Sequence, residues 1–118
     1  MDDAAFLAAL ENGTLPSEQM THAAHLRLAL LCRGQPGRAR EILLRYVEAI
    51  GAHQKYNETL TQVWIRLVDL HPSEKTLEEL LRTQLADSSL PLRHYSRERL
   101  WSDEARTRFV EPDLCPLP

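Results

Sequence analysis

Apolar residues recur every three to four positions through most of the chain, and this period predicts amphipathic helices. The stripe is clearest over residues 38–53, where Ile42, Tyr46, Ala49 and Ile50 share one face. No segment alternates apolar and polar residues as a half-buried strand does. The pattern therefore predicts an all-α fold: a single domain over residues 1–118, built as one compact irregular bundle of five to six helices.

Polar residues that cap helices set the expected limits of these elements. Thr21, Asn57, Thr76, Ser96 and Ser102 each precede a run with helical spacing. A Gly- and Pro-containing turn is expected over residues 33–37. The expected helices cover residues 4–10, 22–32, 38–53, 58–70, 77–86 and 103–110, with a turn over 97–100 and an extended tail over 111–118. The most apolar segment, 58–70, is predicted to be the central helix, and Trp101 is expected on the inner side of the last helix.

Composition and charge exclude several classes of protein. The chain has 118 residues, of which 43% are hydrophobic and 26% charged, and its net charge is −3. Nucleic-acid binding is not expected, since a basic patch supplies that affinity. Cys32 and Cys115 are far apart, which argues against a disulfide framework or a cysteine zinc site. No apolar run is long enough to span a membrane, and the first residues lack a basic leader, so a cytoplasmic protein is expected.

Two histidines three residues apart form the first candidate site. His22 and His25 lie on one face of the helix that follows Thr21, and two imidazoles at this spacing can bind one metal ion. The same spacing arises often by chance, and the alternative is a pair of histidines hydrogen-bonded to the backbone or to carboxylates. Trp64 is most simply a core residue, and a ligand contact is its alternative role.

The segment Tyr56-Asn57-Glu58 is the second candidate, because a polar cluster is unexpected at the start of the most apolar helix. Glu58 with His22 and His25 would complete a two-histidine, one-carboxylate set suited to a divalent metal such as iron. Glu58 could instead act as a general base. The alternative is that Glu58 favours the positive end of the helix dipole and Asn57 is only a cap.

The third candidate lies in the basic segment 93–99, which contains Tyr95 and Arg97. Arg97 follows the expected cap Ser96, so its guanidinium and the first-turn amides could hold an anion together. A solvated face, or an ion pair between Arg97 and Glu58 or another acid, explains the same residues.

Five ordered blocks resemble those of a group of small bacterial proteins: residues 13–16 (GTLP), 21–27 (THAAHLR), 56–61 (YNETLT), 95–100 (YSRERL) and 110–114 (VEPDL). The resemblance implies a lineage rather than an activity. In that group the third block reads Tyr-His-Glu-Thr, so Asn57 stands at a histidine position, and Met20 stands at a tryptophan position. If the group's polar residues form a metal site, this chain lacks one imidazole, and an amide oxygen is a poor replacement for zinc or iron.

Two functional hypotheses follow, and Asn57 favours the first. In the first, a polar pocket binds a small molecule, or the protein is an auxiliary subunit of an enzyme complex. In the second, the protein is a metal-dependent or acid/base enzyme that uses His22, His25 and Glu58. A purely structural interaction domain is a third possibility. The pocket hypothesis and the enzyme hypothesis both require that the side chains of His22, His25 and Glu58 converge. The other residues proposed to contact a ligand are Tyr56, Asn57, Trp64, Tyr95 and Arg97.

Overall fold

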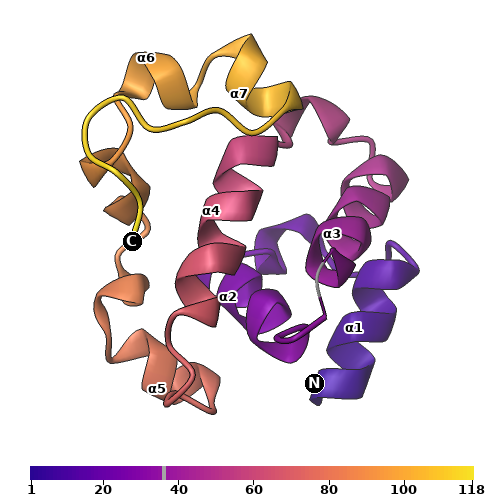
Figure 1. The fold of residues 1–118 in the computed structure, drawn as a ribbon. Coiled ribbons are helices and arrows are strands. Elements are labelled where there is room, and N and C mark those ends of the chain that lie inside the picture. Colours follow the sequence, from indigo (N-terminus) through magenta and orange to yellow (C-terminus); the bar gives the residue numbers. More distant parts are fainter. Residues whose placement is uncertain (36) are drawn as a thin grey trace.

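Seven α-helices and four short 3-10 helices make up the computed structural model, which describes residues 1–35 and 37–118 (Figure 1). The described residues contain no strand, so the all-α prediction is confirmed, whereas the predicted count of five to six helices is too low. Pro36, within the predicted turn at 33–37, lies outside the described residues. The α-helices are α1 (Asp3–Glu11), α2 (His22–Leu31), α3 (Arg38–Ala49), α4 (Glu58–Asp69), α5 (Leu77–Leu81), α6 (Arg97–Leu100) and α7 (Asp103–Thr107). The 3-10 helices are η1 (Ser17–Gln19), η2 (His53–Lys55), η3 (Gln84–Ala86) and η4 (Leu90–Arg93).

All five predicted capping residues are confirmed. The side-chain oxygen of each cap accepts a hydrogen bond from the backbone N–H three residues later, at 2.9 Å for Asn57 and 3.2 Å for Thr21. Thr76, Ser96 and Ser102 do the same at 3.1 Å. These bonds satisfy amides that have no partner within the helix, which is why the starts of the helices follow directly from the sequence.

The ends of three helices differ from the prediction. α3 ends at Ala49 rather than residue 53, because Gly51 adopts φ +69°, outside the helical range. The helix expected over 77–86 is broken into α5 and η3, and α7 ends at Thr107 because Arg108 is extended. Trp101 is 51% exposed at the end of α6, so its predicted inward position is wrong.

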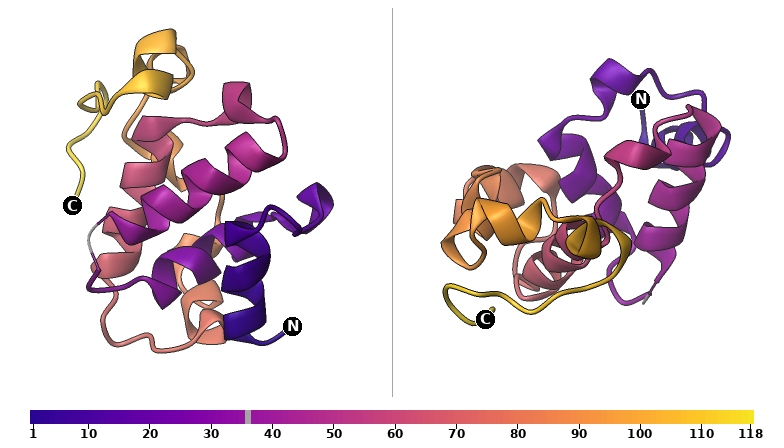
Figure 2. Two further views of the ribbon diagram at one scale, coloured as in Figure 1. Left: turned by 90° about the vertical axis from the view of Figure 1, so that its right-hand side faces the viewer. Right: turned by 90° about the horizontal axis from the view of Figure 1, so that it is seen from above.

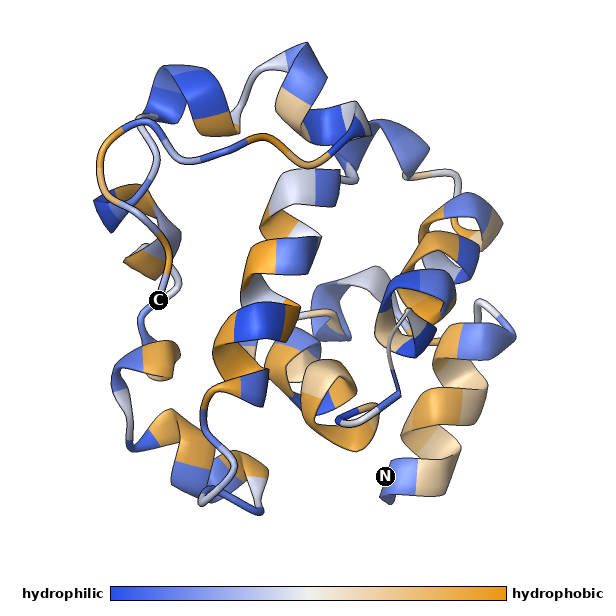
Figure 3. Ribbon diagram, in the orientation of Figure 1, coloured by the Kyte–Doolittle hydropathy of each residue, from blue (hydrophilic) through white to orange (hydrophobic). Residues whose placement is uncertain are grey.

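Two hydrophobic clusters form the core, and α2 contributes to both. One cluster joins α1, α2 and α3 through side chains such as Leu10, Leu28 and Leu43. The other joins α2 and α4 to α5–α7 and the C-terminal segment through Leu26 and Val68, among others. Figure 1 shows α1 and α3 together on one side of α2, with α4 beside it and the C-terminal segments beyond. Figure 3 shows apolar and polar residues alternating along α3 and α4, as expected for helices with one buried face.

The chain forms a compact body with a radius of gyration of 13.9 Å, close to the ~13.5 Å typical of a folded chain of this length. Figure 2 shows the C-terminal segment continuing from α7 without helical structure, and Arg66 of α4 donates to the carbonyl oxygen of Pro118 at its end. Within the described residues, every helix is too short or too polar to traverse a lipid bilayer.

Candidate functional site

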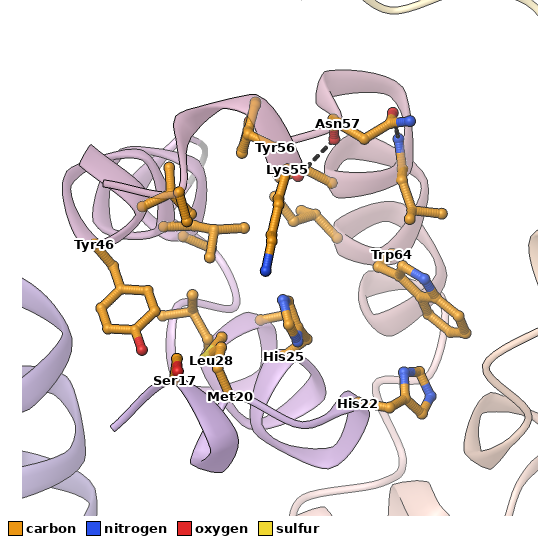
Figure 4. A pocket seen from close by; sticks show the side chains of 18 of the residues that line it. Ser17, Met20, His22, His25, Leu28, Tyr46, Lys55, Tyr56, Asn57 and Trp64 are labelled. Atoms are coloured by element: carbon orange, nitrogen blue, oxygen red, sulfur yellow. Dashed lines mark hydrogen bonds between the residues drawn. The ribbon is translucent and has the colours of Figure 1, made fainter. Parts of the chain in front are cut away.

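A cleft of about 510 Å³ lies between α2, α3, α4 and η2, and is called the central cleft below (Figure 4). It opens where the two hydrophobic clusters meet, since Leu28 and Leu43 belong to one cluster and Ala29 and Trp64 to the other. Its volume lies within the range of small-molecule sites. Its apolar lining is Met20, Leu28, Ala29, Ala39, Leu43, Val47, Ile50, Ala52, Leu60, Trp64 and Ile65; its polar lining is Ser17, His22, His25, Tyr46, Lys55, Tyr56, Asn57, Thr61 and Ser88.

Three helical stripes supply most of this lining. The lining residues recur at intervals of three to four along each helix, for example His22, His25 and Leu28–Ala29 on α2. Such spacing places side chains on one face of a helix. The connection between α3 and α4 closes one end of the central cleft and brings Lys55 over it, with the lysine side chain directed toward His25 (Figure 4).

His22 forms a fixed part of the wall. Its Nε2 lies 2.8 Å from the carbonyl oxygen of Leu85 in η3, and its ring contacts Trp64 edge-on at 4.6 Å between centroids. A carbonyl oxygen only accepts, so Nε2 carries the proton and donates it. This contact joins α2 to η3 and α4, and it leaves His22 little freedom to reorient toward a ligand.

His25 presents a hydrogen-bond acceptor to the central cleft. Its Nδ1 donates to the carbonyl oxygen of Thr21 at 2.8 Å, so in the neutral ring Nε2 carries the lone pair. Burial lowers the pKa of His25; the bond to Thr21 opposes this shift and the neighbouring His22 adds to it. His25 is therefore held in its neutral form, in a cleft that Lys55 also lines.

Glu58 does not join the histidines, so the predicted convergence is wrong. Its carboxylate, in a residue that is 4% exposed, is 2.8 and 2.9 Å from Nε of Arg40 and also accepts from Tyr56 and Gln62. Burial acts to raise the pKa of Glu58, but these hydrogen bonds outweigh it and lower the pKa. In the part of the chain that the structure describes, no three His, Cys, Asp or Glu residues group so that they could hold a metal ion. The three-ligand metal set expected under the enzyme hypothesis is thus not assembled, and the polar pocket predicted from the same three residues fails with it. The central cleft is a different site, because its lining contains the two histidines without Glu58.

Tyr56 and Asn57 line the central cleft, but their polar atoms are engaged elsewhere. The Tyr56 hydroxyl donates to Glu58 at 3.0 Å, and burial is the main reason that its pKa is raised to about 12. Asn57 caps α4 through Oδ1, and its Nδ2 donates to the carbonyl oxygen of Leu100 at 2.8 Å. Both residues therefore shape the wall and connect it to neighbouring elements.

Tyr95 and Arg97 lie away from the central cleft. Tyr95 is fully buried, and its hydroxyl donates to the carbonyl oxygen of Val110 at 2.7 Å. Arg97 is exposed on α6. The Asp113 carboxylate lies at the start of this helix, but it accepts from the backbone N–H and the hydroxyl of the cap Ser96, at 2.8 and 2.6 Å, and not from the groups predicted to hold an anion.

Two functional candidates, Lys55 and Tyr46, did not emerge from the sequence. Tyr46 was assigned only to the apolar stripe, and its hydroxyl donates to the carbonyl oxygen of Leu15 at 2.8 Å. Lys55 falls in a short connection without periodicity. The sequence offers one feature that could have pointed to Lys55: lysine is rare in this chain, with two lysines among 14 lysine and arginine residues.

The central cleft thus combines apolar walls from three helices with a lysine cation and a neutral imidazole acceptor. These groups can hold the polar end of a ligand while the walls cover its apolar part. Comparison of the chain with protein-family models, with curated proteins and with solved structures finds no match, so the geometry of the central cleft carries the functional argument.

Proposed function

We propose that this protein binds a small, predominantly apolar molecule in the central cleft. The observation that carries the proposal is the cleft itself: about 510 Å³ at the junction of the two hydrophobic clusters, with mostly apolar walls and a few polar groups. Sites of this size and composition bury most of the surface of a small ligand, and a few polar contacts orient it.

The fixed conformation of the walls supports this role. His22 and Tyr46 are each held by a hydrogen bond to a backbone carbonyl, and Asn57 is held at both ends of its amide. A cleft whose walls are already ordered loses little side-chain entropy when a ligand enters, and this favours binding.

The other functional hypotheses receive less support. A mechanism in which Glu58 acts with His22 and His25 requires a convergence that is not observed, because Glu58 pairs with Arg40. A role as an auxiliary subunit stays a prediction, which co-purification from the source organism tests. Membership in the group of small bacterial proteins, and a cytoplasmic location, likewise remain proposals based on the sequence alone.

A neutral fluorescent probe tests the proposal. N-phenyl-1-naphthylamine is apolar and uncharged, and its emission rises when it leaves water. We expect saturable binding to the wild-type protein. Ile50→Trp adds a bulky ring at a half-buried position that lines the central cleft, and it should weaken binding at least about tenfold by occupying the space.

Leu70→Trp is the matched control, because it makes a similar change at an exposed position outside the central cleft. This variant should bind the probe as the wild type does. The proposal is refuted if the wild-type protein shows no saturable binding, or if both tryptophan variants retain the wild-type affinity.

A further inference from the structure

We propose that the ligand is a single-chain amphipathic carboxylate, with its head group between Lys55 and His25, and that its binding delivers one proton to His25. The inference rests on the proposed function of the central cleft and adds the chemical class of the ligand. It draws on the charge of the lining, on the shape of the apolar walls and on the hydrogen bond that orients His25.

The charge of the central cleft favours a monoanion. Among the described residues that line the central cleft, Lys55 is the one with a permanent charge, since the lining contains no Asp, Glu or Arg. The ion pairs that the described residues form do not involve Lys55. A single lysine, with a histidine that can become charged, matches one carboxylate, whereas a phosphate dianion is usually held by arginine forks.

The walls away from Lys55 favour an apolar chain. Leu28 of α2, Leu43 and Val47 of α3, and Trp64 and Ile65 of α4 all line the central cleft. No charged side chain interrupts these walls, so an alkyl or similar unbranched chain can lie between α3 and α4 with its carboxylate toward η2 (Figure 4).

The surroundings of His25 explain why a carboxylate would change its protonation. The titratable groups that line the central cleft beside it are His22 on α2, Tyr46 on α3, Lys55 on η2 and Tyr56 before α4; the α4 residues of the lining are uncharged. Burial holds the His25 imidazole neutral, with Nε2 as an acceptor. A carboxylate within a few ångströms favours the imidazolium, whose Nε2–H then donates to the ligand. The proton comes from the solvent, and no covalent bond changes.

Titration calorimetry with decanoate at pH 7 tests both parts of the proposal. In buffers of different ionisation enthalpy, the observed enthalpy should reveal net proton uptake by the wild-type protein. Lys55→Met keeps the apolar stem and removes the charge, so decanoate should bind about tenfold more weakly. His25→Asn retains a donor near the Thr21 carbonyl, and it should abolish proton uptake.

Two matched variants serve as controls. Lys75→Met changes the other lysine, which is exposed and outside the central cleft, and His53→Asn changes an exposed histidine of η2. Both should retain the wild-type affinity and proton uptake. The proposal is overturned if the affinity for decanoate is the same in Lys55→Met as in Lys75→Met, or if proton uptake is absent or persists in His25→Asn.

Decanol and decyltrimethylammonium separate this inference from the proposed function. We expect decanoate to bind more tightly than decanol and the cationic probe to bind weakest. Affinity should rise about fourfold per methylene in the series from octanoate to decanoate, as burial of each group predicts. If decanol binds as tightly as decanoate, the carboxylate assignment fails and the apolar-ligand function stands. If neither alkyl probe nor the neutral fluorophore binds, the proposed function fails as well.

Discussion

Asn57 joins α4 to α6 through two hydrogen bonds, and replacing it by alanine removes both. Oδ1 accepts from the Leu60 N–H at the start of α4, and Nδ2 donates to the buried Leu100 carbonyl at the end of α6. The sequence left open whether Asn57 is a binding residue or a cap. The structure predicts that its main effect is on stability.

The expected magnitude follows from the two bonds. Loss of an N-cap costs about 1 kcal/mol. Leaving the Leu100 carbonyl buried without its donor costs about 1–3 kcal/mol, so Asn57→Ala should lower the free energy of unfolding by about 2–4 kcal/mol. For a chain of this length each kcal/mol shifts Tm by roughly 4 °C, which gives a decrease of about 8–16 °C. Asn57→Ser keeps a capping hydroxyl and should lose only the second contribution.

Urea unfolding and thermal unfolding measure both variants. Thr76→Ala is the control, because Thr76 is an exposed cap of α5 whose side-chain oxygen accepts only from the Glu79 N–H. It should cost about 1 kcal/mol. If Asn57→Ala costs no more than Thr76→Ala, the hydrogen bond to Leu100 contributes nothing and the structural role of Asn57 is refuted.

Two further predictions concern charged side chains outside the central cleft, the buried Glu58 and the half-buried Arg33. Glu58→Gln removes the charge that pairs with Arg40 and should cost about 1–2 kcal/mol at pH 7. The pKa of Glu58 is lowered in the folded protein. The charged carboxylate therefore stabilises the fold fully above the unfolded pKa of 4.5, and this stabilisation is lost as the pH falls from that value through the folded pKa. Urea unfolding at pH 7 and pH 3.5 should show that the difference in the free energy of unfolding between variant and wild type becomes smaller at the lower pH. Arg33→Met removes three hydrogen bonds, of 2.7–3.0 Å, from the guanidinium to backbone carbonyls at and after the end of α4. It should cost about 2–4 kcal/mol and increase hydrogen exchange in the segment that follows α4.

Each of these predictions has a clear contrary outcome. An effect of Glu58→Gln that is equal at both pH values would mean that the charge of Glu58 does not contribute. Wild-type exchange rates after α4 in the Arg33→Met protein would mean that the guanidinium does not hold that segment.

The starts of the helices were predictable because each cap acts locally. Thr21 and Asn57 bond to amides three residues away, so the few residues around each cap determine the geometry. The region after α5 was not predictable in the same way. Leu85 is buried by contacts with distant helices, and these contacts favour a short 3-10 turn over the continuous helix that the local pattern indicates for residues 77–86.

The candidate site was predictable in part. Helical spacing correctly placed His22 and His25 on one wall. Asn57 is the extended N-cap of α4 and lines the central cleft, whereas Glu58 is the first helical residue and lies outside the lining. The sequence alone did not tell which one faces the histidines. Glu58 turned out to face Arg40, whose position depends on the packing of α3 against α4. Lys55 could not be identified, because its place in the lining of the central cleft depends on how the connection after α3 folds.

Intermolecular nuclear Overhauser effects between N-phenyl-1-naphthylamine and the methyl groups of the labelled protein test the central claim most directly. The central cleft predicts contacts from the aromatic protons of the probe to the methyl groups of Leu28, Val47 and Ile65, which face it from three helices. It also predicts none to the exposed Leu114. Contacts confined to residues outside the central cleft, or no contacts at a saturating probe concentration, would contradict a small-molecule site between α2, α3 and α4.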